Sequence, residues 1–489
     1  MTLSHRVRQG VVWLASGEIA RQATQLAIGI VMARLLPPAD FGLVAMAMFF
    51  VGMVQVLARC GFTEALIQKE EVSSDDWSSV YWVGILLGLV VGVTTWLVAP
   101  FAAAFYRDER IIPIVRFVGW AGLLESFCAT QRAWLAKRIQ FQTIAAAEWF
   151  GVLLGGLVAV AMASTGWGLW SLVANTLIGP VLTGLLLHVQ CPWRPGLIVR
   201  ASTLRWASRF GLGFQGFGIL NYLNRHLDDA LIGRYVGPVG LGYYTRAYQL
   251  MLYPVQNVAL VLGRVVFPAL AEIGNDLPRF RAAYLRAVST IAAVTFPLML
   301  GLIVTAPEFI FVIYGAQWMP VVPILRVLCV VGLVQSVETT AGWIYLARAR
   351  TDLFFGWGVA AGLIVYISFL IGIQWGVMGV TLAYAVANAV LLVPCLAIPF
   401  RLIHLPIRDL LRSVIGVLVG SGIMAAIVAA VRAVMLAREA GPGLVLAASV
   451  TSGILIYLAW LWLTDAWAAR EARLVWSRFV GLHRSGALK

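Results

Sequence analysis

Charged residues are scarce in this chain, at 12% of its 489 residues, against about 25% in ordinary soluble domains. Hydrophobic residues make up 61% of the sequence, and its mean hydropathy is +0.88. A globular interior cannot hide that much apolar surface, so most of the chain must face lipid. The composition therefore predicts an integral membrane protein. It excludes soluble enzymes, nucleic-acid-binding proteins and secreted disulfide scaffolds.

Cysteine is rare as well, and none of the five cysteines forms a CxxC pair that would suggest a metal site or a disulfide framework. Acidic residues are also few: 22 Asp and Glu stand against 36 Lys and Arg, which gives a net charge of +14. In a soluble protein this excess would suggest nucleic acid, but cytoplasmic loops of membrane proteins also collect Lys and Arg. We therefore predict no metal site and no nucleic-acid partner.

Long apolar runs are abundant. A helix that crosses the bilayer needs about 20 mainly apolar residues, and about fourteen stretches of the chain fit this pattern. They cover approximately residues 11–33, 41–58, 77–99, 112–131, 144–163, 168–188, 206–233, 241–267, 284–305, 321–346, 353–373, 377–400, 413–434 and 443–464. The sequence predicts an all-α polytopic membrane protein with about 14 transmembrane helices.

The basic residues predict how these helices are oriented. With the N-terminus in the cytoplasm, 24 of the 36 Lys and Arg lie in cytoplasmic segments and 6 lie in outer loops. Because Lys and Arg concentrate on the cytoplasmic side, this split favours an even number of spans with both termini cytoplasmic. No loop is long enough to form a domain, so we expect the function to reside within or between the helices.

A motif near the start of the chain recurs about 200 residues later. The segment Arg34-Leu-Leu-Pro-Pro38-Ala-Asp-Phe-Gly42 is echoed by Arg234-Tyr-Val-Gly-Pro238-Val-Gly-Leu-Gly242, each between an odd-numbered span and the next. A second pair, Gly122-Leu-Leu-Glu125-Ser126 and Gly332-Leu-Val-Gln335-Ser336, occupies the fourth span of each half. Pro and Gly turns recur in any polytopic protein, but the order of these matches favours two homologous six-span lobes in parallel orientation.

The repeat divides the chain into lobes. We expect an N-lobe at 1–190, a cytoplasmic inter-lobe loop at 191–205, a C-lobe at 206–400, two further spans at 401–465 and a basic cytoplasmic tail at 466–489. Transporters built from such repeats bind substrate between the lobes and expose it to the two sides of the membrane in turn.

Polar side chains gather on the first and seventh spans. In the first span, four of them follow the spacing i, i+3, i+4 and i+7, which places them on one helical face; they are Glu18, Arg21, Gln22 and Gln25. The seventh span, its repeat partner, carries Asn221, Arg225 and Asp228 on one face, with Asp229 beside them. Charged groups in a bilayer are costly and normally face a cavity. We therefore expect both helices to line a shared central cavity.

Arginine is prominent in this predicted cavity, and its planar guanidinium binds phosphate through two parallel hydrogen bonds. We expect a pyrophosphate and its sugars to be held by Arg21, Gln22, Gln25, Asn221, Arg225 and Arg246. The candidates for ion coupling or charge balance are Glu18, Asp228, Asp229, Glu125 and Glu338. The alternative is that Glu18 neutralises Arg21, and that Asp228 or Asp229 neutralises Arg225, within one helix at i, i+3 or i+4 spacing. No residue is predicted to be catalytic or to bind a metal.

Several short motifs, strongest between about 193 and 336, resemble those of the bacterial polysaccharide flippases of the colanic-acid or lipopolysaccharide exporter type. This family belongs to the multidrug/oligosaccharidyl-lipid/polysaccharide exporter superfamily. The motifs are Trp193-Arg194-Pro195, Phe210-Gly211, Asp229-Ala-Leu-Ile-Gly233-Arg234, Leu241-Gly242-Tyr243-Tyr244, Val266-Phe267-Pro268-Ala269-Leu270, Ala306-Pro307-Glu308 and Gly315-Ala-Gln-Trp318. The joint order of the motifs carries the resemblance, because no single one is unique.

The resemblance implies two six-helix lobes in a V, with two additional C-terminal helices. It also implies a flippase that moves undecaprenyl-pyrophosphate-linked oligosaccharide from the inner to the outer leaflet of the bacterial inner membrane, for surface polysaccharide, exopolysaccharide or lipopolysaccharide biosynthesis. Related lipid II flippases use cavity arginines near their first and seventh helices. Arg21 and Arg225 are the counterparts that we expect here, although no motif match identifies them.

Other interpretations differ in substrate or in class. A multidrug or cation antiporter of the same superfamily would favour an acidic, arginine-poor cavity, which the first and seventh spans do not offer. A polysaccharide polymerase, ligase or glycosyltransferase would need catalytic residues on a substantial outer loop, whereas Asp108-Glu109 lies in a short turn. We expect a transporter that works as a monomer without a cofactor, coupled to H⁺ or Na⁺, in contact with membrane lipids and with polysaccharide polymerase and export machinery as partners.

Overall fold

The computed structural model describes residues 3–58, 62–69, 71–274 and 276–464. The described part of the chain folds into helices and contains no strand, which confirms the predicted all-α class. Ten segments are long and apolar enough to cross a membrane. Each predicted span coincides with helix, but α1, α9 and α10 are not among the ten segments, so the count of fourteen spans stays a prediction. The predicted tail at 466–489 lies outside the described residues.

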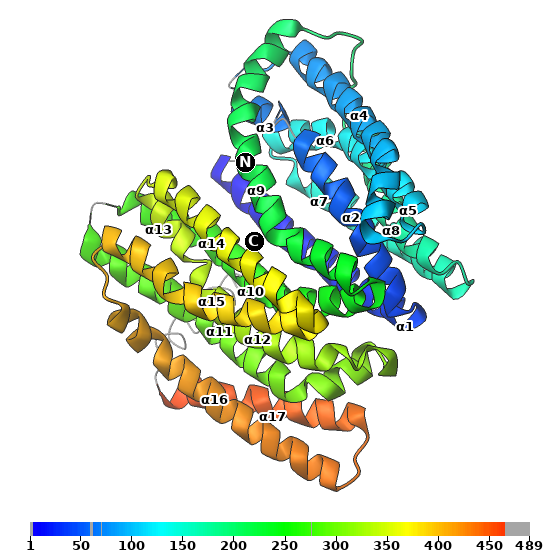
Figure 1. Ribbon diagram of the computed structural model, residues 1–489. Coiled ribbons are helices and arrows are strands. Elements are labelled where there is room, and N and C mark those ends of the chain that lie inside the picture. Colours follow the sequence, from blue (N-terminus) through cyan, green and yellow to red (C-terminus); the bar gives the residue numbers. More distant parts are fainter. Residues whose placement is uncertain (1–2, 59–61, 70, 275, 465–489) are drawn as a thin grey trace, which may run out of the picture. The chain divides into compact units, whose positions relative to one another are not determined.

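The contacts divide the chain into two compact units, 1–245 and 246–489. The helices that lie wholly in unit 1 are α1 (Leu3–Leu35), α2 (Pro38–Ala58), α3 (Phe62–Gln68), α4 (Ser74–Tyr106), α5 (Ile111–Val118), α6 (Ala121–Lys137), α7 (Phe141–Ser164), α8 (Leu169–Gln190) and α9 (Ala201–Tyr235). Helix α9 packs against α2, α3 and α4 (Figure 1). The structure thus joins α9 to unit 1, and the lobe boundaries expected from the repeat stay a prediction.

Helix α10 (Pro238–Glu272) begins in unit 1 and continues into unit 2. The remaining α-helices of unit 2 are α11 (Leu277–Ile313), α12 (Val321–Glu338), α13 (Ala341–Ala347), α14 (Thr351–Gly372), α15 (Gly376–Leu402), α16 (Ile407–Ala437) and α17 (Pro442–Leu463). Short 3₁₀ turns at Ala316–Trp318 and Ile373–Trp375 precede α12 and α15.

Small residues let the helices of unit 1 approach closely. Gly151 and Gly155 of α7 face Gly179 of α8, so that a Cβ at Gly155 would lie 2.8 Å from the Gly179 backbone. On its other side α7 packs against α1, where Trp149 Nε1 donates a hydrogen bond to Thr24 Oγ1 at 3.0 Å. Close backbone approach at small residues is the usual way in which membrane helices associate, because lipid offers no hydrophobic drive between them.

The repeated Pro–Gly motifs meet each other at the start of α2 and the start of α10, both in unit 1. A Cβ built on Gly42 would overlap the backbone of Pro238, and a Cβ built on Gly242 would overlap the carbonyl of Pro38. The contact is reciprocal, since each glycine lies against the proline of the other motif. Two segments that match at an offset of 200 in the sequence therefore make the same contact in space, which supports the repeat.

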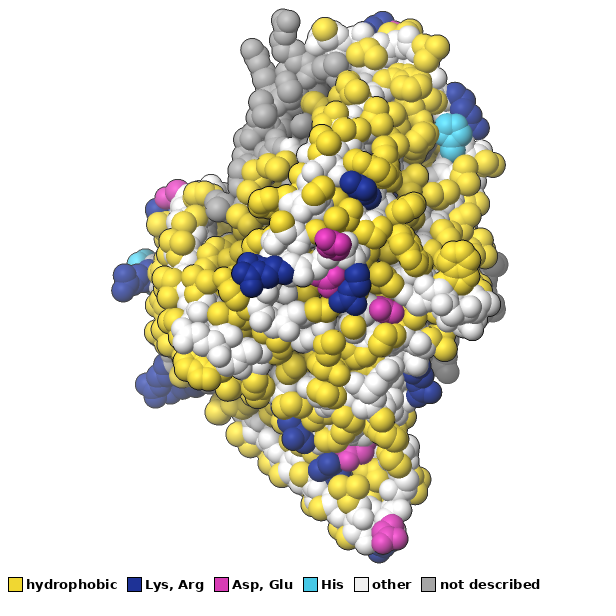
Figure 2. All heavy atoms as spheres, turned by 45° about the vertical axis from the view of Figure 1, so that its right-hand side comes forward, with side chains coloured by type: hydrophobic (Ala, Val, Ile, Leu, Met, Phe, Trp, Pro, Cys, Tyr) yellow, Lys and Arg dark blue, Asp and Glu magenta, His cyan; other side chains and the backbone are white. Residues whose placement is uncertain are grey.

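The core of unit 2 lies between α11, α15 and α16, where Phe280, Tyr284 and Phe400 are buried. Tyr284 shares a hydrogen bond of 2.9 Å with Thr340. Elsewhere the described helices expose many large apolar side chains, and the face in Figure 2 is mostly hydrophobic with few charges. Such a surface fits contact with lipid and confirms a multi-pass membrane protein.

The Pro–Gly contact predicts that Gly42→Ala destabilises the protein. The added methyl group must displace the backbone of Pro238, an overpacking that typically costs about 1–3 kcal/mol. Gly84→Ala in α4 is the matched control, because no atom lies within 4 Å of its Cβ position. Thermal unfolding of the purified proteins in detergent should show a lower Tm for Gly42→Ala and an unchanged or higher one for Gly84→Ala. Equal melting temperatures for the two variants would contradict the close approach.

Candidate functional site

The polar residues of α1 form one connected set. Arg21 pairs with Glu18 through Nη2 at 2.6 Å and Nε at 2.9 Å. Gln22 donates to Glu18 at 2.6 Å, and Arg21 Nη1 donates to Gln25 Oε1 at 3.3 Å. The structure therefore places all four predicted residues in contact. It also contains the Glu18–Arg21 ion pair that the i, i+3 spacing allows.

A second ion-paired set joins α6 and α7. Arg132 donates through Nη1 to Glu125 at 2.7 Å, and its Nε lies 2.9 Å from Glu148 Oε1. Helix α7, which carries Glu148, packs against α1, which carries the Glu18–Arg21 pair. We refer to the ion-paired residues of these three helices, Glu18, Arg21, Glu125, Arg132 and Glu148, as the polar network of unit 1. Each arginine in this network is neutralised by at least one carboxylate.

Sequence reasoning missed two members of this network. Arg132 directly follows the predicted span at 112–131, but it lies in α6, about one turn before the helix ends. Glu148 lies in the first half of α7 and was not considered. A signal for Arg132 existed, because Glu125 and Arg132 are seven residues apart and so share a helix face. No local spacing connects Glu148 to either.

Arg225 differs from the arginines of this network. It is exposed on α9 and makes no hydrogen bond or ion pair with the described part of the chain. The two carboxylates that could neutralise it have other partners: Asp228 accepts a hydrogen bond of 2.8 Å from Tyr244, and Asp229 lies 3.2 Å from His226 Nδ1. The expected alternative, self-neutralisation within α9, is therefore not what the structure contains. Asn221, one turn earlier, is exposed as well.

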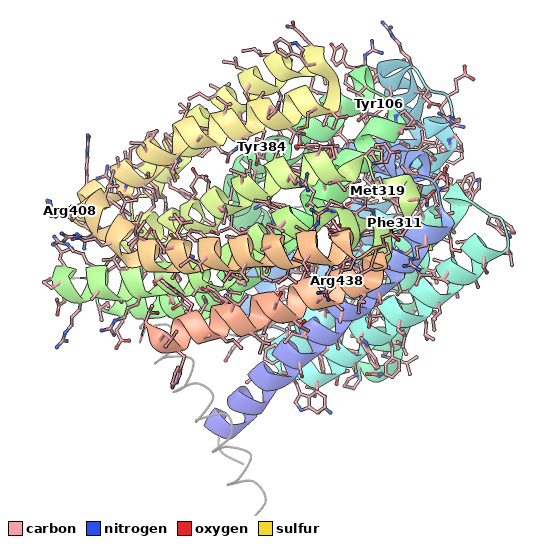
Figure 3. The ribbon with its side chains drawn as sticks, turned by 90° about the horizontal axis from the view of Figure 1, so that it is seen from below. Tyr106, Phe311, Met319, Tyr384, Arg408 and Arg438 are labelled. Atoms are coloured by element: carbon pink, nitrogen blue, oxygen red, sulfur yellow. The ribbon has the colours of Figure 1, made fainter. Side chains whose placement is uncertain are left out.

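The acidic residues of α9 sit among tyrosines from neighbouring helices. Asp228 is buried, and its Oδ1 has no hydrogen-bond partner among the described residues. The hydroxyl of Tyr106, at the end of α4, is buried and also lacks one there (Tyr106 is labelled in Figure 3). Tyr222 fixes α9 to α2 by donating to the carbonyls of Met48 and Phe49 at 3.1 and 2.8 Å.

Two of the predicted residues, Arg246 and Glu338, belong to unit 2. Arg246 Nη1 donates to Gln249 at 3.2 Å. Glu338 is at the end of α12, and its Oε1 is buried without a hydrogen-bond partner in the described residues. One turn earlier, Gln335 donates to the Tyr384 hydroxyl at 2.6 Å (Tyr384 is labelled in Figure 3). Whether these groups share a cavity with α1 and α9 stays a prediction.

Asp108, in the acidic turn considered above for an enzyme, forms an ordinary ion pair. In the turn between α4 and α5, Arg110 donates to both carboxylate oxygens of Asp108, at 3.0 and 2.7 Å. This hydrogen-bonded pair lowers the pKa of Asp108, so it stays ionised and is unsuited to act as a general acid. No group of three or more His, Cys, Asp or Glu that could hold a metal occurs in the described ranges.

A family model described as "Polysaccharide biosynthesis protein" matches residues 31–323. Two curated relatives resemble most of the chain. The lipopolysaccharide biosynthesis protein WzxC of Escherichia coli (strain K12) is 27% identical over 397 residues, which cover 80% of each chain. The teichuronic acid biosynthesis protein TuaB of Bacillus subtilis (strain 168) is 28% identical over 348 residues, 69% of this chain and 70% of that one.

Solved structures share the fold. The lipid II flippase MurJ in an inward closed conformation superposes with a TM-score of 0.74 at 18% identity, covering 92% of this chain and 98% of its own. An inward-facing MATE family multidrug resistance transporter of the MOP superfamily superposes with a TM-score of 0.64 at 16% identity. The superposition covers 81% of this chain and 98% of the transporter. At such low identity these likenesses establish the fold alone.

The polar network predicts that Arg132→Met destabilises the protein more than the loss of one surface ion pair would. The substitution leaves Glu125 and Glu148 without their shared cation. Removing one partner of a buried pair costs about 3–5 kcal/mol. Because a third of the Arg132 side chain is exposed, we expect roughly 1–3 kcal/mol.

The triple variant Arg132→Met, Glu125→Gln, Glu148→Gln removes the orphaned charges and should recover much of the lost stability. Thermal unfolding of the single and triple variants measures both effects. A triple variant that melts lower than Arg132→Met would show that the charges are not coupled as the network requires.

Proposed function

Because the chain belongs to the polysaccharide biosynthesis protein family, whose model matches residues 31–323, we propose that it is a flippase for lipid-linked oligosaccharide. The cargo is an undecaprenyl-pyrophosphate-linked repeat unit, moved from the inner to the outer leaflet of the bacterial inner membrane. Relatives named for lipopolysaccharide and teichuronic acid biosynthesis support this cargo class. The fold shared with a lipid II flippase supports movement by alternating access.

The observation that carries the proposal is the guanidinium of Arg225, which has no hydrogen-bond or ion-pair partner among the described residues. An arginine within a membrane helix is costly unless it has a partner, and the neighbouring Asp228 and Asp229 bind Tyr244 and His226 instead. A pyrophosphate supplies the missing partner, because its oxygens accept the two parallel hydrogen bonds that a guanidinium donates. An organic cation, the cargo of a multidrug exporter, would be repelled by the same group.

The remaining cavity residues provide the rest of the cargo's contacts. Gln25 and Asn221 are exposed on α1 and α9, and their amides both donate and accept hydrogen bonds, as sugar hydroxyls require. Gln22 orients Glu18, which in turn holds Arg21. We assign Arg21 and Arg246 to the phosphate-binding set as the further cations on α1 and α10.

Coupling to H⁺ or Na⁺ requires a carboxylate that is not already neutralised. Glu338 and Asp228 suit this role, since each has a buried oxygen without a hydrogen-bond partner in the described structure. Glu18, Glu125 and Asp229 are paired with Arg21, Arg132 and His226 and serve charge balance instead. We assign ion coupling to the first two.

The protein would work as a monomer, because two fused lobes suffice for one alternating cavity. It would hand its cargo to a polysaccharide polymerase and export machinery on the outer side of the membrane. It needs no cofactor for this step, since moving a lipid-linked sugar between leaflets breaks no bond in the cargo.

The role of Arg225 predicts a graded loss of transport. Arg225→Ala removes charge-assisted hydrogen bonds worth about 1.5–3 kcal/mol, or about 10- to 150-fold in cargo binding. Arg225→Lys keeps the charge but loses the planar fork, so we expect an intermediate effect. Surface polysaccharide in the host that lacks the native gene, complemented by each variant, measures the outcome.

Arg438→Ala, in the exposed turn between α16 and α17 (Figure 3), is the control for removal of an arginine. Its polysaccharide export should equal that of the parent, and the amount of each variant in the membrane should be equal too. Normal export by Arg225→Ala would remove this residue from the mechanism. Intact polysaccharide together with raised drug resistance on overexpression would favour a multidrug antiporter.

A further inference from the structure

The segment between α8 and α9 combines exposed apolar side chains with positive charge. Residues 192–200 form neither helix nor strand. Leu197 is 88% exposed, Val199 57% and Ile198 45%. From 191 to 209 the sequence contains four arginines and no acidic residue. A loop in water would have no reason to present three consecutive apolar side chains.

The backbone of this segment is bound to the first turns of α4. Gly196 N–H donates to Ser78 Oγ at 3.0 Å, and its carbonyl accepts from Trp82 Nε1 at 2.8 Å. Arg200 N–H donates to Ser79 Oγ at 2.8 Å. Side chains of α4 thus satisfy backbone groups that would otherwise need water. This matters near a membrane, where unsatisfied backbone polar groups are costly.

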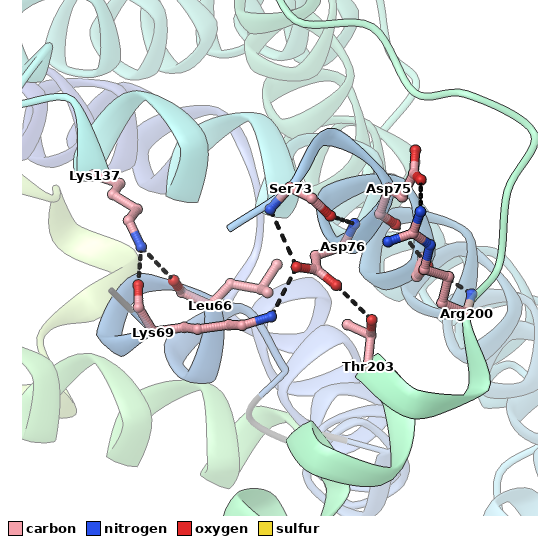
Figure 4. Close-up of polar contacts among 9 residues, drawn as sticks. Leu66, Lys69, Ser73, Asp75, Asp76, Lys137, Arg200 and Thr203 are labelled. Atoms are coloured by element: carbon pink, nitrogen blue, oxygen red, sulfur yellow. Dashed lines mark hydrogen bonds and ion pairs between the residues drawn. The ribbon is translucent and has the colours of Figure 1, made fainter. Parts of the chain in front are cut away.

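Side chains hold the segment at both ends. At its start, Trp193 Nε1 donates to Ser74 Oγ at 3.2 Å. At its end Arg200 pairs with Asp75, and Thr203, in the first turn of α9, donates to Asp76 at 2.5 Å (Figure 4). Asp76 is itself fixed, since Lys69 binds it at 2.8 Å and it completes the capping box with Ser73. The backbone that carries Leu197, Ile198 and Val199 is therefore held in place by its contacts with the start of α4.

The length of α4 places the start of this helix, and the segment bound to it, at the edge of the bilayer. Its 33 residues extend about 50 Å at about 1.5 Å per residue, whereas the hydrocarbon is about 30 Å thick. Polar residues stand at both ends, in the first turn and in the turn that follows Tyr106. Trp77, Trp82 and Trp193 lie together at the bound end, as tryptophans do at a membrane–water interface.

We propose that residues 196–199 are an interfacial membrane anchor, with Leu197, Ile198 and Val199 inserted into the headgroup–acyl boundary beside the start of α4. Arg194, exposed in the same segment, attracts anionic headgroups to this surface. The anchor holds the connection between α8 and α9 at a fixed depth in the membrane. It does not depend on the nature of the cargo.

Spin labels placed at 197, 198 and 199, one at a time, test this anchor. The full-length chain carries one introduced cysteine in a background where the five native cysteines are alanine, and it is reconstituted in nanodiscs of phosphatidylethanolamine and phosphatidylglycerol. Collision of each label with oxygen, which concentrates in lipid, is compared with collision with a water-soluble nickel chelate. Two control labels give reference collision rates. A label at Leu89, exposed in the middle of α4, gives the rates expected in lipid, and a label at Glu109 gives those expected in water.

Labels at 197–199 should collide with oxygen more than with nickel, at values between those of the two controls and closer to Leu89. When a zwitterionic lipid replaces phosphatidylglycerol, the collision rates of these labels should move toward those of the Glu109 label. Nickel collisions equal to those at Glu109 would overturn the proposal and leave this face to a soluble protein. Collisions mainly with oxygen at Leu89 and mainly with nickel at Glu109 establish that the labelled chain is inserted and folded.

Discussion

A charge inside a membrane protein must find a partner, and this requirement organises the polar residues of the chain. Arg132 lies between Glu125 and Glu148, and Arg21 is held by Glu18. The Glu18–Arg21 pair lies within α1, whereas Arg132 joins α6 to α7 through Glu148. Arg225 has no such partner in the described structure. The exception therefore marks the place where a ligand of opposite charge is expected.

Hydrogen bonds to other helices hold α9, the helix that carries Arg225, at three points along its length. Thr203 is bound to Asp76 at its start, Tyr222 is bound to the backbone of α2 in its middle, and Asp228 is bound to Tyr244 near its end. The reciprocal contact of the two Pro–Gly motifs fixes the starts of α2 and α10 against each other. Exposed groups on α9 are thus presented by a rigid helix, which lowers the cost of ordering them when cargo binds.

Local patterns in the sequence predicted what depends on local geometry. Apolar runs predicted the helices, and the spacing of Glu18, Arg21, Gln22 and Gln25 predicted a face that the structure contains. Pairing across helices was not predictable: Glu148 meets Arg132 from another helix, and Asp228 binds Tyr244 although Arg225 is only three residues away. Spacing within one helix allows several polar pairings, and contacts with other helices determine which of them form.

The central claim is that this chain moves a lipid-linked oligosaccharide across the membrane, and the lipids of depleted cells test it most directly. A lipid extract made after depletion of the protein is analysed by mass spectrometry for undecaprenyl-pyrophosphate oligosaccharides. The account predicts accumulation of undecaprenyl pyrophosphate that carries one complete repeat unit. Unchanged lipid-linked intermediates, together with intact surface polysaccharide, would contradict it.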